Sequence, residues 1–290
     1  MTRLVPFVFV VLWSTGFIGA RYGLPWIEPF NLLLLRMMIT LAAFLVLIAI
    51  FRPRWPNRSQ AGHQVVVGLL VHAGYLGGVF AAIKLALPAG VTALIVGLQP
   101  VLTAVLARVA FGRSLSWLQW FGLSTGLAGV SLVLGSGLAG RNFAVHPGAL
   151  VAACLALVSI SVGTLYQKRY GGETDLLTGS FFQYLATAVC MAILTWSFET
   201  GDILWHPHLI GALVWLALGL SVSAILLLML MIRRGEVSRV ASYFYLVPPL
   251  TAIEAWWLFD ERLSVPALLG ILITVIGVYL VLRRPRSEVR

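Results

Sequence analysis

Long runs of apolar residues, separated by short polar connections, make up most of the chain. Each run is close to the ~20 residues that cross the hydrocarbon core of a bilayer as a helix. The runs are apolar on all faces instead of alternating, which predicts helices and not the strands of a membrane barrel. The predicted spans cover residues 4–20, 32–51, 64–83, 91–108, 117–135, 147–167, 177–198, 209–231, 238–259 and 265–282.

The composition also indicates a helical membrane protein. The chain has 290 residues, of which 60% are hydrophobic and only 10% charged, against about 25% charged residues in a soluble domain. No connection is long enough for a soluble domain, so we expect an all-α integral membrane protein that acts inside the bilayer. The first run follows Arg3 and also fits a cleaved signal peptide. That alternative would leave nine spans and break the symmetry described below.

The net charge of +10 reports orientation. If the N-terminus is cytoplasmic, only Arg21, Lys84, Arg141 and Arg262 of the 20 Lys and Arg residues fall outside. Arg36 lies within a span, and the remaining fifteen fall on the cytoplasmic side. This bias follows the positive-inside rule. It predicts both termini in the cytoplasm and an even number of spans, and it explains the basic charge without a nucleic-acid partner.

The chain contains an internal repeat. Residues 97–134 align without a gap to residues 245–282, at a constant offset of 148 (245 − 97), with about fifteen identities over 38 positions. Shared Leu and Val are common in membrane segments, but Pro100 with Pro248 and Phe111 with Phe259 are more specific matches. We interpret this as a duplication, with repeats over residues 1–140 and 141–290.

An odd number of spans in each repeat has a geometric consequence. With five helices each, the second repeat enters the membrane in the opposite sense to the first. Two inverted repeats are typical of secondary transporters, in which a site at the bilayer midplane is exposed to each side in turn. The fold class expected is therefore ten transmembrane helices in two inverted five-helix repeats.

Five stretches carry a resemblance to a known family, including "AAIKLALPAGVTALIVGLQPVLTAVLA" (81–107) and "RRGEVSRVASYFYLVPPLTAIEAWWLFDERLS" (233–264). The chain resembles the drug/metabolite transporter superfamily, in particular ten-helix exporters with two EamA-type domains. The resemblance implies a central cavity, cytoplasmic termini, and export of small metabolites such as amino acids across a bacterial inner membrane. One departure is Gly112-Arg113, where the family usually has Gly-Glu; the second repeat keeps Asp260-Glu261.

Two charged residues within spans are candidate site residues. Arg36 matches the usual arginine of the family; it is interpreted either as an anchor that reaches the interface or as a ligand for a substrate carboxylate. An acid within a span is costly and marks a site by default, so Glu254 is a candidate for proton coupling. The alternatives for Glu254 are a hydrogen-bonded or interfacial acid and an ion pair with Arg36.

Prolines within spans remove a backbone hydrogen bond and free a carbonyl. Pro100 and Pro248 are therefore candidates for helix breaks that line the cavity and permit gating; the alternative is a kink that aids packing. The remaining candidates for the cavity are polar or aromatic residues within spans. They are Trp13, His72, Tyr75, Gln99, Gln183, Tyr243 and Tyr245.

Enzyme chemistry finds no support in the sequence. No catalytic cluster, zinc-ligand spacing or P-loop is present, so we expect no cofactor, no metal and no ATP dependence. The expected partners are a small-molecule substrate and the lipid bilayer, with the protein a monomer or homodimer. A cavity of low net charge favours zwitterionic or amphipathic solutes. A flippase-like carrier of lipid-linked substrates and a non-transporting scaffold or sensor remain alternative functions.

Overall fold

A computed structural model describes residues 5–111, 116–140, 146–172, 174–223, 227, 247–261 and 263–282. Within these ranges the chain is almost wholly helical, and the only extended pairing is a bridge between Ile27 and Ile203. The all-α prediction is confirmed. The helices are α1 (Val5–Gly23), α2 (Pro29–Phe51), α3 (Arg58–Val67), η2 (Gly68–Gly74), α4 (Tyr75–Lys84), α5 (Ala89–Val96), α6 (Gln99–Phe111), α7 (Trp117–Gly140), α8 (Pro147–Tyr170), α9 (Leu176–Phe198), α10 (Pro207–Val214), η3 (Trp215–Val222), α13 (Val247–Phe259) and α14 (Val265–Leu282).

Helix ends follow local sequence signals. Proline occupies the first turn of α2, α8 and α10, where its missing N–H costs nothing and its fixed φ suits the helix. Asn57 and Gln60 form a capping box at the start of α3, and the Asp175 carboxylate accepts from Leu177 N at the start of α9. These caps satisfy backbone donors that the helix itself leaves open.

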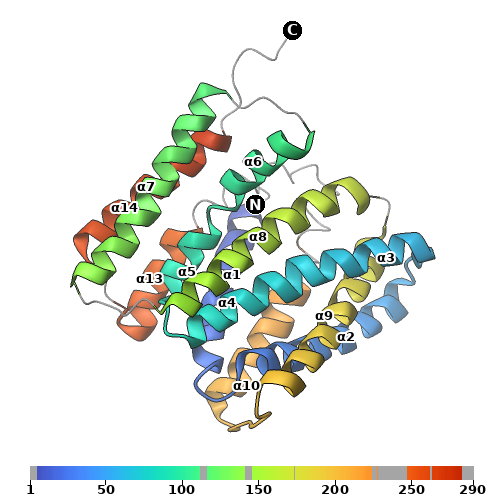
Figure 1. Cartoon of the computed structure of the whole chain (residues 1–290). Helices are drawn as coiled ribbons and strands as arrows, with labels where there is room; N and C mark the ends of the chain where they lie inside the picture. Colours follow the sequence, from blue (N-terminus) through green and yellow to red (C-terminus); the bar gives the residue numbers. More distant parts are fainter. Residues whose placement is uncertain are drawn as a thin grey trace.

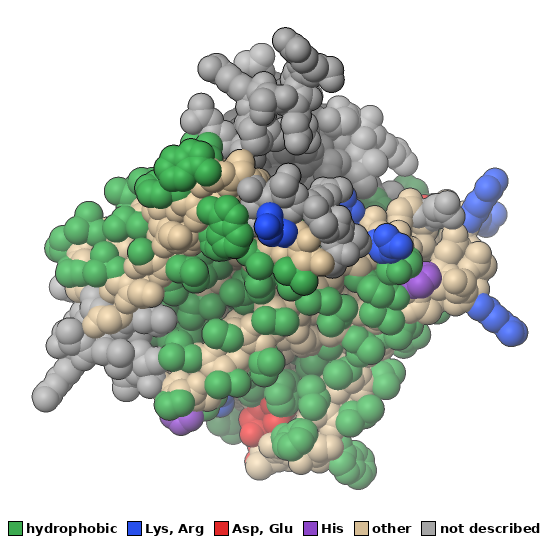
Figure 2. Space-filling view, turned by 45° about the horizontal axis from the view of Figure 1, so that its top comes forward, with side chains coloured by type: hydrophobic (Ala, Val, Ile, Leu, Met, Phe, Trp, Pro, Cys, Tyr) green, Lys and Arg blue, Asp and Glu red, His purple; other side chains and the backbone are tan. Residues whose placement is uncertain are grey.

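Length and composition identify membrane crossings. In the described residues, five helical segments are long and apolar enough to cross a membrane; they are Pro29–Phe51, Arg58–Lys84, Ala89–Val109, Pro147–Tyr170 and Leu176–Phe198. Figure 2 shows one face covered mainly by hydrophobic side chains. Among the exposed hydrophobic residues of the described chain, Ile50 is 66% and Trp196 92% exposed. Such exposure suits contact with lipid. The count of ten spans stays a prediction, because parts of the eighth and ninth lie outside the described residues.

Helices of the two halves pack against their counterparts. Helix α2 lies against its counterpart α9, α5 against α13, and α7 against α14 (Figure 1). Two further pairs, α4 with α8 and α1 with α10, each join the third span of one repeat to the first span of the other. Counterparts run antiparallel: α2 begins where α9 ends, and the Glu199 carboxylate after α9 accepts from Phe30 N and Asn31 N at 2.7 and 2.8 Å. This is the pairing that a two-fold axis between inverted repeats produces.

The α7–α14 pair packs backbone against backbone through glycine. A Cβ added at Gly129 would lie 2.6 Å from Gly270 O, and one added at Gly277 would lie 2.7 Å from Gly122 O. Gly122 and Gly270 are repeat counterparts, as are Gly129 and Gly277 (270 − 122 = 277 − 129 = 148). The contact is therefore self-complementary. Small residues that let two backbones approach closely are typical of helix contacts in membranes.

Candidate functional site

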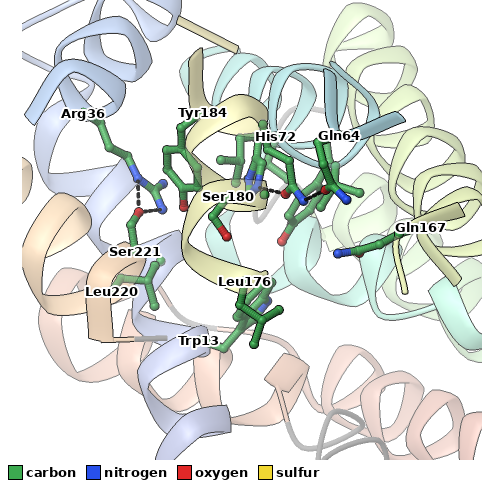
Figure 3. A pocket seen from close by; sticks show the side chains of 18 of the residues that line it. Trp13, Arg36, Gln64, His72, Gln167, Leu176, Ser180, Tyr184, Leu220 and Ser221 are labelled. Atoms are coloured by element: carbon green, nitrogen blue, oxygen red, sulfur yellow. Dashed lines mark hydrogen bonds between the residues drawn. The ribbon is translucent and has the colours of Figure 1, made fainter. Parts of the chain in front are cut away.

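A cavity of about 170 Å³ lies between the two halves (Figure 3). Its walls come from α1, α2 and the α3–η2–α4 rod of the first half, and from α8, α9 and η3 of the second. These are the first three predicted spans of each repeat. Five residues singled out in the sequence line it together, namely Trp13, Arg36, His72, Tyr75 and Gln183.

Arg36 is the buried cation of the cavity. Its side chain is only 4% exposed, so the interpretation as an anchor that reaches the interface is wrong. The Ser221 hydroxyl accepts from its Nε at 3.2 Å and from its Nη2 at 3.0 Å, and Figure 3 shows the guanidinium beside the Tyr184 ring. The alternative ion pair with Glu254 is wrong as well, because Arg21–Glu261 is the one ion pair among the described residues.

Two π-helical segments face each other across the cavity. The segments η2 and η3 lie at corresponding places in the two repeats, since Gly68 shifted by 148 falls on Leu216. A π-helix leaves its backbone carbonyls irregularly paired, and such segments are frequent at functional sites. In η3 the Ser221 hydroxyl donates to Leu216 O at 3.0 Å while it accepts from Arg36. The irregular backbone of η3 thus holds the only hydrogen-bond partner that the described residues give to the Arg36 guanidinium.

A polar chain crosses from η2 to α9. His72 Nε2 lies 3.1 Å from Gln183 Oε1, and Gln183 Nε2 donates to Gln64 Oε1 at 2.6 Å. Because an amide oxygen can only accept, His72 carries its proton on Nε2 in this arrangement. Gly68 permits the close approach, since a Cβ there would lie 2.6 Å from Gln183 Cα. His72 also packs on the Tyr184 ring, with centroids 4.5 Å apart.

The rest of the wall is apolar and aromatic. The Trp13 indole hydrogen-bonds the Tyr75 side chain, which fixes both rings at the cavity surface. Phe17, Phe80 and Leu220 complete this wall. The cavity therefore combines one cationic corner, one neutral polar strip and a broad apolar face.

Two further predicted residues do not line this cavity, and two more lie outside the described residues. Gln99 donates to Thr164 Oγ1 at 2.9 Å and is absent from the cavity lining. Glu254, also absent from it, accepts from Ser14 at 2.8 Å through Oε1, while its buried Oε2 has no partner among the described residues. Tyr243 and Tyr245 lie outside the described residues.

The two prolines lie in the fourth and ninth spans, which pack against each other. The fourth span is divided into α5 and α6, with Pro100 in the first turn of α6, and Pro248 is the second residue of α13. A Cβ added at Gly97, in the break itself, would lie 2.7 Å from Pro248 Cγ. The break between α5 and α6 thus lies against Pro248 of the other repeat. The role of both prolines in gating stays a prediction.

The sequence did not single out Ser221 or Gln64 as site residues. Ser221 looked like one small residue in an apolar span, and Gln64 stood at the predicted start of another. The repeat offset offered one signal, because Ser221 lies in the segment that corresponds to η2 and its His72.

The two ends of the cavity differ. Towards one end its lining includes Gly171, Thr174 and Asp175 of the α8–α9 connection, which the charge bias predicts on the cytoplasmic side. On the side that the charge bias predicts to be outer, α1 and α13 are joined by an ion pair of 3.4 Å between Arg21 Nε and Glu261 Oε1 and by packing of Tyr22 on Phe259.

Comparison with known proteins agrees with this architecture. The profile of the EamA-like transporter family matches residues 4–135 and 147–283. The chain belongs to this family. An uncharacterized transporter, YvbV of Bacillus subtilis, is 26% identical over 99% of this chain and 93% of its own. A probable amino-acid metabolite efflux pump of Escherichia coli is 25% identical over 93% and 91%. One crystal structure shares the fold, with a TM-score of 0.66 and 24% identity over 96% of each chain.

Membership of the EamA-like family places the chain among multi-pass membrane proteins that transport small solutes and not among enzymes. The predicted family and membrane class are therefore confirmed. Two family segments match, on either side of residues 136–146; the predicted boundary at 140/141 is a finer statement and stays a prediction.

Proposed function

We propose that this EamA-like protein exports small amino-acid-related metabolites across a bacterial inner membrane by alternating access. The observation that carries the proposal is the buried, cationic Arg36 in a cavity between the two halves. A buried charge within a membrane span costs free energy, so its presence marks a ligand site or a transport pathway by default. The probable amino-acid metabolite efflux pump among the relatives supports the choice of solute.

Alternating access requires one end of the cavity to close while the other is open. The Arg21–Glu261 and Tyr22–Phe259 contacts join the first half to the second at one end. Lining residues reach the α8–α9 connection at the other. With the predicted cytoplasmic termini, this arrangement supports a state that receives solute from the cytoplasm.

Counterflow in proteoliposomes tests transport. Vesicles with purified protein are preloaded with a mixture of amino acids, purines, sugars and cationic dyes, and exchange with labelled solutes is followed. We expect Arg36→Ala to lower exchange of the preferred solute at least about tenfold, because a lost hydrogen bond to a charged group costs about 1.5–3 kcal/mol. Gln99→Ala is expected to have little effect, since Gln99 bonds Thr164 away from the cavity lining.

Arg58→Ala is the matched control, because Arg58 is exposed at the start of α3. Exchange unaffected by Arg36→Ala would contradict a role for the cavity. A folded protein that exchanges no solute would instead favour a carrier of lipid-linked substrates or a scaffold.

Glu254 is proposed as the proton-coupling group. It joins α13 to α1 through Ser14, one residue from Trp13 of the cavity, and its free Oε2 can take a proton. We expect Glu254→Gln to abolish uptake driven by a pH gradient while solute exchange at equal pH persists. Uptake driven as strongly as in the wild type would contradict this role. Asp202→Asn is the control, since Asp202 is exposed in the connection between α9 and α10.

A further inference from the structure

We propose that the cavity selects carboxylates that lack a free ammonium group, such as N-acylated amino acids and 2-oxo acids, over zwitterionic amino acids. This inference rests on the proposed transport function and narrows its substrate class.

The first step is the uncompensated charge of Arg36. Its guanidinium is buried, its partner Ser221 is neutral, and no acid among the described residues lies within ion-pair distance of it. A buried charge without a counter-ion is unfavourable. A bound anion would offset that cost, so the cavity favours a solute that carries net negative charge.

The second step is the geometry of the Arg36–Ser221 contact. One hydroxyl oxygen accepts from both Nε and Nη2, at 3.2 and 3.0 Å. These two donors lie along one edge of the guanidinium, which is the edge that a carboxylate binds with two parallel hydrogen bonds. A carboxylate at this edge replaces a single neutral acceptor by two charged oxygens. When the carboxylate replaces Ser221 as the acceptor for Arg36, the Ser221 hydroxyl can still donate to Leu216 O.

The third step is that the described lining offers almost no negative charge to an ammonium. Asp175 is the one acid in the described lining, and its carboxylate accepts from Leu177 N at 2.8 Å at the start of α9. In the polar chain, Gln183 Oε1 and Gln64 Oε1 already accept from their neighbours.

An α-ammonium would moreover be held close to Arg36 by the carboxylate next to it. Two like charges about 5 Å apart at an effective dielectric constant of about 20 repel enough to weaken binding by roughly a hundredfold before screening. Acylation or replacement of the amine by a carbonyl removes this repulsion. The apolar wall of Phe17, Phe80 and Leu220 suits the hydrocarbon body of such an acid.

The test compares solutes with one body and different charge. Proteoliposomes with the full chain are preloaded with phenylalanine, N-acetylphenylalanine, phenylpyruvate or phenylalaninamide, and exchange with labelled N-acetylphenylalanine is measured for each preload. We expect the two anions to support exchange at least tenfold better than phenylalanine, and the cationic amide to support none. Arg36→Gln is expected to abolish the preference, whereas Arg36→Lys, which keeps the charge, is expected to retain it at lower affinity.

The outcomes separate the two proposals. Phenylalanine exchanging as well as or better than N-acetylphenylalanine would overturn the selection for anions and leave the transport function intact. A folded protein that exchanges none of the four, nor any solute of the counterflow mixture, would overturn both. If Arg36→Gln preferred the anions over phenylalanine as strongly as the wild type does, Arg36 would not be the residue that sets the preference.

Discussion

Gly277→Leu is expected to prevent the two halves from packing into a stable protein. A Cβ at position 277 would overlap Gly126 N and lie 2.7 Å from Gly122 O. Both atoms are backbone of α7, so no side chain can rotate away. Overpacking costs about 1–3 kcal/mol where side chains adjust, and we expect more here because whole helices must separate. The measurement is the fraction of protein that elutes as a single species in detergent, together with its unfolding temperature.

Gly135→Leu is the matched control for this prediction. Gly135 lies on the partner helix α7, and a Cβ there meets no other atom within 4 Å. A leucine at this exposed position should leave elution and unfolding temperature close to those of the wild type. If Gly277→Leu were as stable as Gly135→Leu, the close α7–α14 contact would not be what joins these helices.

Glu261→Arg is expected to open the end of the cavity that α1 and α13 close. The substitution replaces an attraction to Arg21 across 3.4 Å by a repulsion. Side-chain exposure of 43% for Arg21 screens the interaction, so we expect a change of about 2 kcal/mol, or roughly thirtyfold in the balance of closed and open states. The first repeat carries Arg113 at the corresponding position (113 + 148 = 261).

Labelling of a cavity cysteine measures this opening. Ser180→Cys is introduced after Cys154 and Cys190 are replaced by alanine, and a membrane-impermeant thiol reagent is added on the outer side. Glu261→Arg should speed labelling, and Arg21→Glu in the same chain should slow it again. Unchanged labelling in Glu261→Arg would show that this contact does not close the cavity.

The pH dependence of the same contact has a defined sign. Burial raises the pKa of the Glu261 carboxyl, and Arg21 partly opposes this shift. The closed state therefore binds a proton more tightly than an open state in which Glu261 is hydrated. Closure is favoured at acidic outer pH, and this contribution is lost as the pH rises through the raised pKa. Because the thiolate is the form that reacts, labelling of Ser180→Cys is compared with and without Glu261→Gln. As the outer pH falls, labelling should slow more steeply in the chain that keeps Glu261.

The fold class could be read from sequence because its causes are local or repeated. Apolar runs of membrane length must become helices, since lipid offers no partner to the backbone. The constant offset of 148 between residues 97–134 and 245–282 predicted the duplication, and five helices per copy required inversion. Helix α2 lying antiparallel to α9 follows from that count.

The candidate site could be predicted only in part. Arg36 and His72 were recognisable because a polar group within a span is costly and needs a reason. Gln99 satisfied the same rule, yet it bonds Thr164 and does not line the cavity. The rule identifies buried polarity, but it does not say which neighbour satisfies it.

The sequence by itself determined the membrane class, the repeat, the helical runs and the list of costly polar residues. Only the tertiary structure decided their partners: Arg36 with Ser221, 185 residues away, and Ser14 with Glu254, 240 residues away. The physical reason is that hydrophobic residues are distributed nearly evenly around each of these helices, so the sequence does not mark the face that packs inward. Their rotation and register are instead set by contacts between backbones, such as Gly68 on Gln183 and Gly129 on Gly270.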